Sequence, residues 1–97
     1  MKTEFFSLLT GVVLLSAIST AQASDCLYAY KAKRDNPLQL HYGVIAIVGR
    51  CDTQSAQQET AARLRSNGWE LLLLLERVVP SKINQYRETA GEFFLRY

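Results

Sequence analysis

The fold depends most on residues 68–80, which read GWELLLLLERVVP. Leucine favours helices, so a helix is the competing interpretation of the five consecutive leucines. Gly68 and Pro80 bound the stretch, however, and a helix would leave no charged face across the leucines. We therefore predict that residues 69–79 form a strand, the strongest one in the chain.

The residues before this strand favour a helix. From about Gln54 to Asn67 the chain is rich in Ala, Gln, Glu and Arg, and Asp52 or Thr53 can cap the first turn. Gly68 tolerates the left-handed conformation that ends a helix. The stripe expected to be buried consists of Ala56, Thr60 and Leu64, with Ala61 beside them. These side chains are small, so the helix can lie close on a sheet.

Two further strands are predicted before the helix. Residues 26–33 alternate, with Tyr28 and Tyr30 on the face expected to point inward. A turn at residues 34–37, rich in Asp, Asn and Pro, leads to a second strand at residues 40–49. One face of this second strand carries Tyr42, Val44, Ala46 and Val48, and the other carries Ile45 and Ile47.

The last part of the chain is predicted to complete a hairpin. Residues 81–89 are polar and irregular, which is typical of a long connection. Residues 90–97 are expected to form the final strand, with Phe93, Leu95 and Tyr97 on one face. The predicted fold is thus α+β: a small antiparallel sheet of ββαββ order, with one helix packed on one face.

A single helix covers only one face of such a sheet. The apolar residues that would then lie opposite the core are Ile45, Ile47, Leu72, Leu74 and Phe94. Exposed apolar surface of this extent indicates a partner, either a second copy or another protein. We expect strand addition at an exposed edge, with Leu72 and Leu74 as anchors. The alternative is that strand twist and residues 81–89 cover the second face.

The first residues have the three-part layout of a secretory signal peptide. Residues 1–2 give a positive start, residues 5–18 are almost wholly apolar, and residues 21–23, AQA, fit a cleavage site. An apolar run of about 14 residues is shorter than the roughly 20 that a membrane anchor needs. We predict a signal peptide at residues 1–23 and a single domain at residues 24–97 that is periplasmic or secreted.

Export to an oxidising compartment favours a disulfide between Cys26 and Cys51, the two cysteines of the chain. The sequence has no Cys-x-x-Cys motif, so the bond is expected to be structural and not catalytic. Pairing within one chain and pairing between two chains both remain open. A lipid anchor on Cys26 is not expected, because Asp25 stands where a lipoprotein signal requires a small residue.

Composition excludes several function classes. The 97 residues are 48% hydrophobic and 21% charged, which excludes a disordered chain, and the net charge of +2 is too small to indicate a nucleic-acid partner. His41 is the only histidine; we expect it at a strand edge and not on a metal ion. Nucleophile and nucleotide motifs are absent from the sequence. We therefore expect neither an enzyme nor a bound cofactor.

One basic stretch offers a second functional hypothesis. Lys31, Lys33 and Arg34 follow Tyr28 and Tyr30 closely, and such a stretch can contact anionic lipid or polysaccharide at the cell envelope. The competing interpretation places the tyrosines in the core and uses the lysines to protect the sheet edge. An envelope-surface binding module is therefore the alternative to a module that binds protein.

The segment GVIAI, residues 43–47, resembles the first strand of the YhcN/BhsA/McbA-type domain of small exported proteins in Gram-negative bacteria. The family continues with a helix that ends before a glycine, matched here by residues 67–68. Its last strand begins at a glycine, matched by residues 91–97. The resemblance covers residues 42–97. It implies an α+β fold and a non-enzymatic role in envelope stress or biofilm physiology.

A second resemblance concerns residues 68–71, GWEL, together with residues 94–96, FLR. They are similar to small bacterial domains marked by a Gly-Trp-Glu-Leu turn, which have no agreed function. Both resemblances imply an α+β architecture. The functional hypothesis is accordingly a non-enzymatic exported domain that acts through protein–protein contact, as a homo-oligomer or with another envelope protein.

Overall fold

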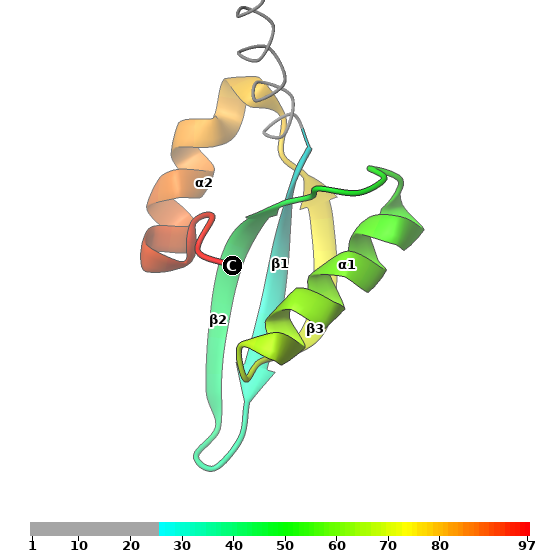
Figure 1. The fold of residues 1–97 in the computed structure, drawn as a ribbon. Coiled ribbons are helices and arrows are strands. Elements are labelled where there is room, and N and C mark those ends of the chain that lie inside the picture. Colours follow the sequence, from blue (N-terminus) through cyan, green and yellow to red (C-terminus); the bar gives the residue numbers. More distant parts are fainter. Residues whose placement is uncertain (1–25) are drawn as a thin grey trace, which may run out of the picture.

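The computed structural model describes residues 26–97, so the predicted signal peptide at residues 1–23 lies outside the described residues. The α+β class is confirmed (Figure 1). Short 3₁₀ turns at Pro80–Lys82 and Gly91–Phe93 flank the last helix. In chain order, the elements are strand β1 (Leu27–Arg34), strand β2 (Gln39–Ala46), helix α1 (Thr53–Ser66), strand β3 (Glu70–Arg77) and helix α2 (Ile83–Ala90).

The three strands form one antiparallel sheet in the order β2-β1-β3. β1 and β2 pair as a regular hairpin whose turn lies at residues 35–38, close to the predicted position. The chain then crosses one face of the sheet as α1 and returns as β3 on the other side of β1. Both β2 and β3 are therefore edge strands, and the central strand β1 is the most buried one.

The predicted final strand is wrong, because the last part of the chain is helical. Residues 83–90 form α2, and Phe94 makes only an isolated parallel bridge with Val44. Ile83, Tyr86 and Ala90 follow the spacing i, i+3, i+7, which places all three on one side of a helix. Because the residues between them are polar, the sequence of this segment resembles that of a loop between two strands. The order is thus ββαβ followed by a helix, and not ββαββ.

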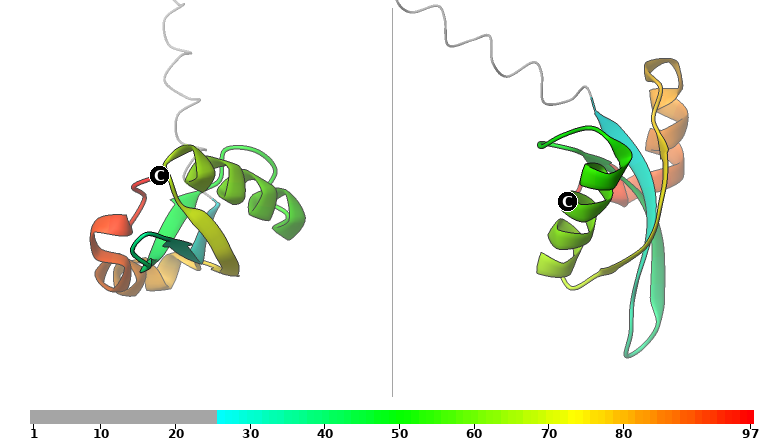
Figure 2. Two further views of the ribbon diagram at one scale, coloured as in Figure 1. Left: turned by 90° about the horizontal axis from the view of Figure 1, so that it is seen from below. Right: turned by 90° about the vertical axis from the view of Figure 1, so that its right-hand side faces the viewer.

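The two helices cover opposite faces of the sheet, so the prediction of a single covered face is also wrong (Figure 2). The buried cluster under α1 consists of Cys26, Tyr28, Tyr30, Ala32, Ile45, Ile47, Ala56, Leu64 and Trp69. The buried cluster under α2 consists of Leu27, Val44, Val78 and Ala90. Residues 81–89 therefore do help to cover the second face, as the alternative interpretation expects, but as a helix and not as a loop.

The strand β2 faces α1 with the side that was expected to lie opposite the core. Ile45 and Ile47 are buried in the α1 cluster, whereas Val44 points to α2. Leu74 packs against the α1 cluster and Phe94 against the α2 cluster, so Leu72 is the one residue of the predicted apolar set that stays about half exposed. The alternation of side chains assigns residues to the two faces of a strand. When both faces are apolar, the alternation does not indicate which helix covers which face.

Local signals in the sequence set the ends of α1 as predicted. The Asp52 carboxylate caps the first turn by accepting a hydrogen bond from the amide of Ser55 (3.0 Å). Gly68 adopts a positive φ of 84°, and the amide of Trp69 then reaches back to the carbonyl of Leu64 (2.9 Å). The predicted buried stripe is confirmed by the burial of Ala56, Thr60 and Leu64.

The predicted disulfide is confirmed and lies within one chain. Cys26 and Cys51, with Cα atoms 6.0 Å apart, join the start of β1 to the segment that precedes α1. The hydroxyl of Tyr28 donates a hydrogen bond to the carbonyl of Cys51 (2.9 Å). A disulfide and a hydrogen bond thus both connect the start of β1 to residue 51.

A polar network on α1 fixes the loop after β2. The carboxylate of Glu59 accepts hydrogen bonds from the amides of residues 48–49 at 2.9 and 2.8 Å. Arg63 bonds to Glu59 and also donates to the carbonyl of Ala46, both at 2.7 Å. The other guanidinium nitrogen of Arg63 donates to the main-chain oxygen of Tyr97. Although burial opposes it, this network holds the pKa of Glu59 below its ordinary value.

Candidate functional site

The outer edge of β3 is an exposed strand edge. Among residues 26–97, β1 is the only strand that pairs with β3. In the right-hand view of Figure 2, this edge faces the reader and no strand lies in front of it. An unpaired edge presents main-chain N–H and C=O groups that can bind another extended chain.

The leucines of β3 are divided between core and surface. Leu71 and Leu74 pack against the α1 cluster, whereas Leu72 and Leu73 keep 48% and 54% of their surface exposed. Two adjacent residues of a regular strand point to opposite faces, but here a shift of register between Lys31 and Ala32 of β1 interrupts the alternation. The irregularity leaves two large apolar side chains uncovered next to each other.

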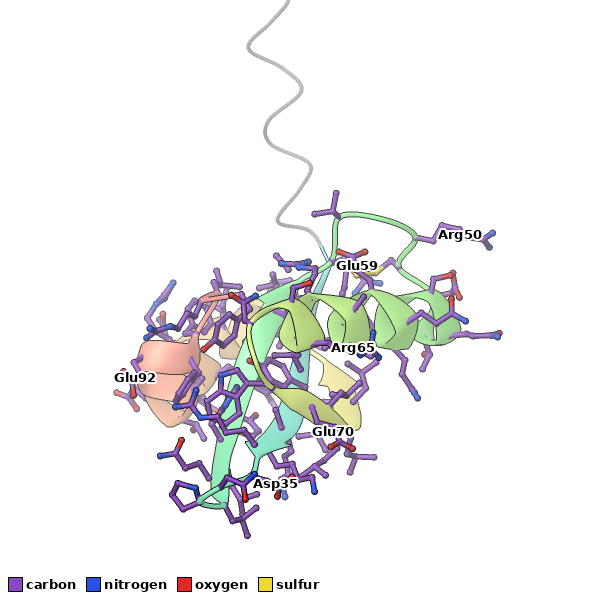
Figure 3. All side chains as sticks on the ribbon, turned by 60° about the horizontal axis from the view of Figure 1, so that its bottom comes forward. Asp35, Arg50, Glu59, Arg65, Glu70 and Glu92 are labelled. Atoms are coloured by element: carbon purple, nitrogen blue, oxygen red, sulfur yellow. A yellow bond between two sulfur atoms is a disulfide. The ribbon has the colours of Figure 1, made fainter. Side chains whose placement is uncertain are left out.

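A groove of about 560 Å³ lies between α1 and β3, beside this edge. From α1, the side chains at every fourth position line it, namely Gln57, Ala61 and Arg65. Figure 3 shows Arg65 on the side of α1 that faces β3, with Glu70 at the start of β3 on the same side of the molecule. The remaining lining residues are Gln58, Trp69 and Leu71. We call this feature the α1–β3 groove.

A second hollow continues the apolar surface on the face that α2 covers only in part. Its volume is about 300 Å³, and its lining residues are Lys31, Ala32, Leu40, His41, Tyr42 and Leu72. Leu40 and the neighbouring Leu38 are both largely exposed. The hollow therefore connects Leu72 of β3 with Leu40 of β2, whereas Leu38 and Leu73 do not line it.

The structure separates the residues predicted to interact. Leu72 lies at the surface, and Leu74 lies partly buried beneath α1. Tyr28 and Tyr30 belong to the core, where Tyr30 is fully buried. Burial is also the main reason that the pKa of Tyr30 is raised. Neither tyrosine offers a surface to a partner in this conformation.

The basic stretch does not form one patch. Lys31 and Lys33 lie on the face of β1 opposite to that of Arg34, since successive side chains of a strand alternate. Lys33 forms an ion pair with Asp35 (3.4 Å). The guanidinium of Arg34 lies 4.3 Å from the centre of the Trp69 ring. Lys31 is thus the most available of the three cations.

His41 is buried, although its strand is an edge strand. Its Nε2 lies 2.8 Å from the hydroxyl of Tyr30, its ring stacks on Phe93 with centroids 3.8 Å apart, and Trp69 meets it edge-on at 4.3 Å. Burial, with a smaller contribution from the positive charges of Arg34 and Arg96, lowers the pKa of His41 from 6.5 to about 4. The imidazole is therefore neutral at physiological pH and packs as an aromatic side chain.

Within the described part of the chain, no three His, Cys, Asp or Glu side chains gather in a way that could hold a metal ion. None of the helices within residues 26–97 has the length and apolar character needed to span a membrane.

The polar wall of the groove is not predicted by the sequence. From the sequence, Gln57, Gln58 and Arg65 are predicted only to belong to the helix at residues 54–67. Their spacing relative to Ala61 is a signal that places them on one stripe beside the buried one. A polar stripe next to a buried stripe is common on any surface helix, so the spacing alone does not indicate a binding groove.

Comparison with protein-family models, with curated proteins and with solved structures finds no match to this chain. The two resemblances drawn from sequence motifs therefore remain hypotheses.

Proposed function

We propose that this protein is an exported, non-enzymatic binding module that acts through protein–protein contact. An extended segment of a partner, either another envelope protein or a second copy, pairs with the outer edge of β3. The observation that carries this proposal is the pair Leu72 and Leu73, which stay about half exposed on a strand edge that no other described strand covers. In this mode, main-chain hydrogen bonds supply affinity and apolar side chains anchor the added strand.

Two features support the exported location. The leader pattern at residues 1–23 is that of a secretory signal peptide. The bond between Cys26 and Cys51 is of a kind that persists in oxidising compartments. The envelope stress or biofilm context suggested by the family resemblance is part of the same proposal.

Site-specific photo-crosslinking tests the contact. A photoreactive residue at position 73 is expected to crosslink to an extended segment of one envelope protein or of a second copy. A synthetic peptide of that segment should then bind the purified protein. We expect the change Leu72→Lys with Leu73→Lys to weaken this binding at least tenfold, because lysines on an edge strand oppose strand addition.

The matched control adds the same charge elsewhere. Leu38→Lys with Val48→Lys replaces two apolar residues that are even more exposed, at 63% and 79%, but lie outside β3. Binding by this control should stay within about twofold of the unchanged protein. Equal weakening by both pairs of substitutions, or the absence of crosslinks from position 73, would contradict the proposal.

A second candidate is contact with anionic lipid or polysaccharide. The exposed Leu38 and Leu40 at the hairpin tip, with Lys31 on the same face as Leu40, favour it. Co-sedimentation with anionic liposomes, with Lys31→Glu and Lys33→Glu as the test variant, measures this contact. Cationic binding should fade at high salt, whereas strand addition should persist.

A further inference from the structure

We propose that the α1–β3 groove selects the partner, and that it accepts an extended peptide carrying an acidic side chain opposite Arg65. This inference rests on the proposed function, since it assumes that the peptide is the strand added to β3. The groove and the strand edge are then two parts of one site, in which the edge binds the main chain and the groove recognises side chains.

The position of the groove follows from the geometry of strand addition. Side chains of an added strand alternate between the two faces of the sheet. Those on the α1 side would enter the α1–β3 groove, whose volume of about 560 Å³ lies in the range of about 300–1,000 Å³ typical of ligand sites. Those on the other side would meet Leu72 and Leu73, so we expect them to be apolar.

The charge of the groove argues for an acidic side chain. Arg65 forms no ion pair with any of residues 26–97, whereas Arg63 on the same helix is engaged by Glu59 and by two main-chain oxygens. The acidic residue of the groove, Glu70, already lies 3.9 Å from Lys33. The guanidinium of Arg65 is thus a cation available for a bidentate contact with a carboxylate.

The other residues that line the groove suit small or polar peptide side chains next to the acidic one. Gln57 and Gln58 supply amide groups that both donate and accept hydrogen bonds. Ala61 and Leu71 add apolar surface to the groove. We therefore expect the groove-facing positions of the peptide to be small or polar, with Asp or Glu at one of them.

Selection from a random linear peptide library displayed on phage, with the disulfide-bonded protein as bait, tests this specificity. The expected consensus alternates apolar with small or polar residues and contains one Asp or Glu. A synthetic peptide of that consensus can be titrated through the fluorescence of Trp69, which is the only tryptophan and lines the groove. Arg65→Glu should weaken its binding at least tenfold and shift the selected residue from Asp or Glu to Lys or Arg.

The control Lys82→Glu makes the same change of charge on the turn before α2 and should leave binding within twofold. Binding that needs Leu72 and Leu73 but ignores Arg65→Glu would overturn the groove and leave strand addition standing. Binding that needs Arg65 but ignores both leucines would overturn strand addition. A library without enriched peptides, or a protein that dimerises through β3 and resists competition by peptide, would overturn the proposal for an acidic peptide.

Discussion

At the scale of single residues, His41 carries the clearest pH dependence. Its pKa of about 4 in the folded protein lies below the ordinary 6.5 of the unfolded chain, because burial disfavours the charged ring. Between these two values the unfolded state binds more protons, so stability falls as the pH falls from about 6.5 to about 4. We expect His41 to account for a loss of about 3 kcal/mol across this range.

Urea unfolding at a series of pH values, followed through Trp69, measures this loss. His41→Phe keeps an aromatic ring beside Phe93 and removes the titrating group, so it should flatten the curve above pH 4. The carboxylates of Asp52 and Glu59, whose pKa values are also lowered, act at lower pH and are common to both proteins. Identical curves for the two proteins between pH 4 and 6.5 would show that His41 does not cause the effect.

A second prediction for a single residue concerns Gly43. A Cβ atom at this position would lie 2.5 Å from the hydroxyl oxygen of Tyr30 and 2.6 Å from its ring. Because Tyr30 is fully buried, its ring has no free space to move into. Gly43→Ala should therefore destabilise the protein by about 1–3 kcal/mol, measured by urea unfolding.

The double variant Gly43→Ala with Tyr30→Leu provides the control for this contact. If the collision with the Tyr30 ring is the cause, the two changes together should cost less than the sum of their separate effects. Strict additivity would point to another cause. The sequence shows the glycine but not the ring that crosses it, since the pairing of Tyr30 with Gly43 depends on the register of β1 and β2.

At the scale of elements, α2 is where prediction from the sequence failed. Its apolar positions are only Ile83, Tyr86 and Ala90, and eight residues are too few for a strong periodic signal. An isolated helix of this length is marginal in water, so its stability comes mainly from packing on the sheet. α1, by contrast, has a cap at Asp52, a terminating glycine and fourteen residues, and its bounds were predicted to within one residue.

Docking of α2 can be tested at Ala90, which is buried against the sheet. Ala90→Asp places a charge in this contact and should cost about 2–4 kcal/mol, with increased binding of an apolar dye as the face opens. Thr89→Asp puts the same residue at the exposed neighbouring position and should change stability by less than about 0.5 kcal/mol. Similar losses for both would mean that α2 is not held by this contact.

At the scale of the whole molecule, a small core is divided between two faces of a thin sheet. Neither buried cluster is large, and a domain of this size is marginally stable without a crosslink. The bond between Cys26 and Cys51 closes a loop with a sequence separation of 25. Reduction should therefore lower the free energy of unfolding by about 3 kcal/mol.

Urea unfolding with and without a reductant checks this value. Replacement of both Cys26 and Cys51 by Ala should reproduce the effect of the reductant, and the reductant should then have no further effect. An unchanged midpoint on reduction would mean that the hydrogen bond from Tyr28 to the carbonyl of Cys51 is enough to hold the two segments together.

The candidate site could be predicted from the sequence only in part. The leucine-rich strand and the exposed Leu72 could be predicted, because five leucines between glycine and proline read as a separate apolar element. The exposure of Leu73 and the burial of Leu74 could not, because they follow from a shift in register between β3 and β1. Arg65 could not be singled out either, since its position in a groove depends on how α1 crosses β3.

Local patterns in the sequence are enough to predict the α+β class, the three strands that form, both ends of the helix α1, and the cysteine pair. Each of these features follows from a local signal: alternation, capping residues, a terminating glycine or the count of cysteines. The three-dimensional packing was needed to show that residues 83–90 form a helix, which face of β2 lies under α1, and which edge of the sheet stays open. These features depend on contacts between segments distant in the chain, and a short apolar pattern is compatible with more than one set of such contacts.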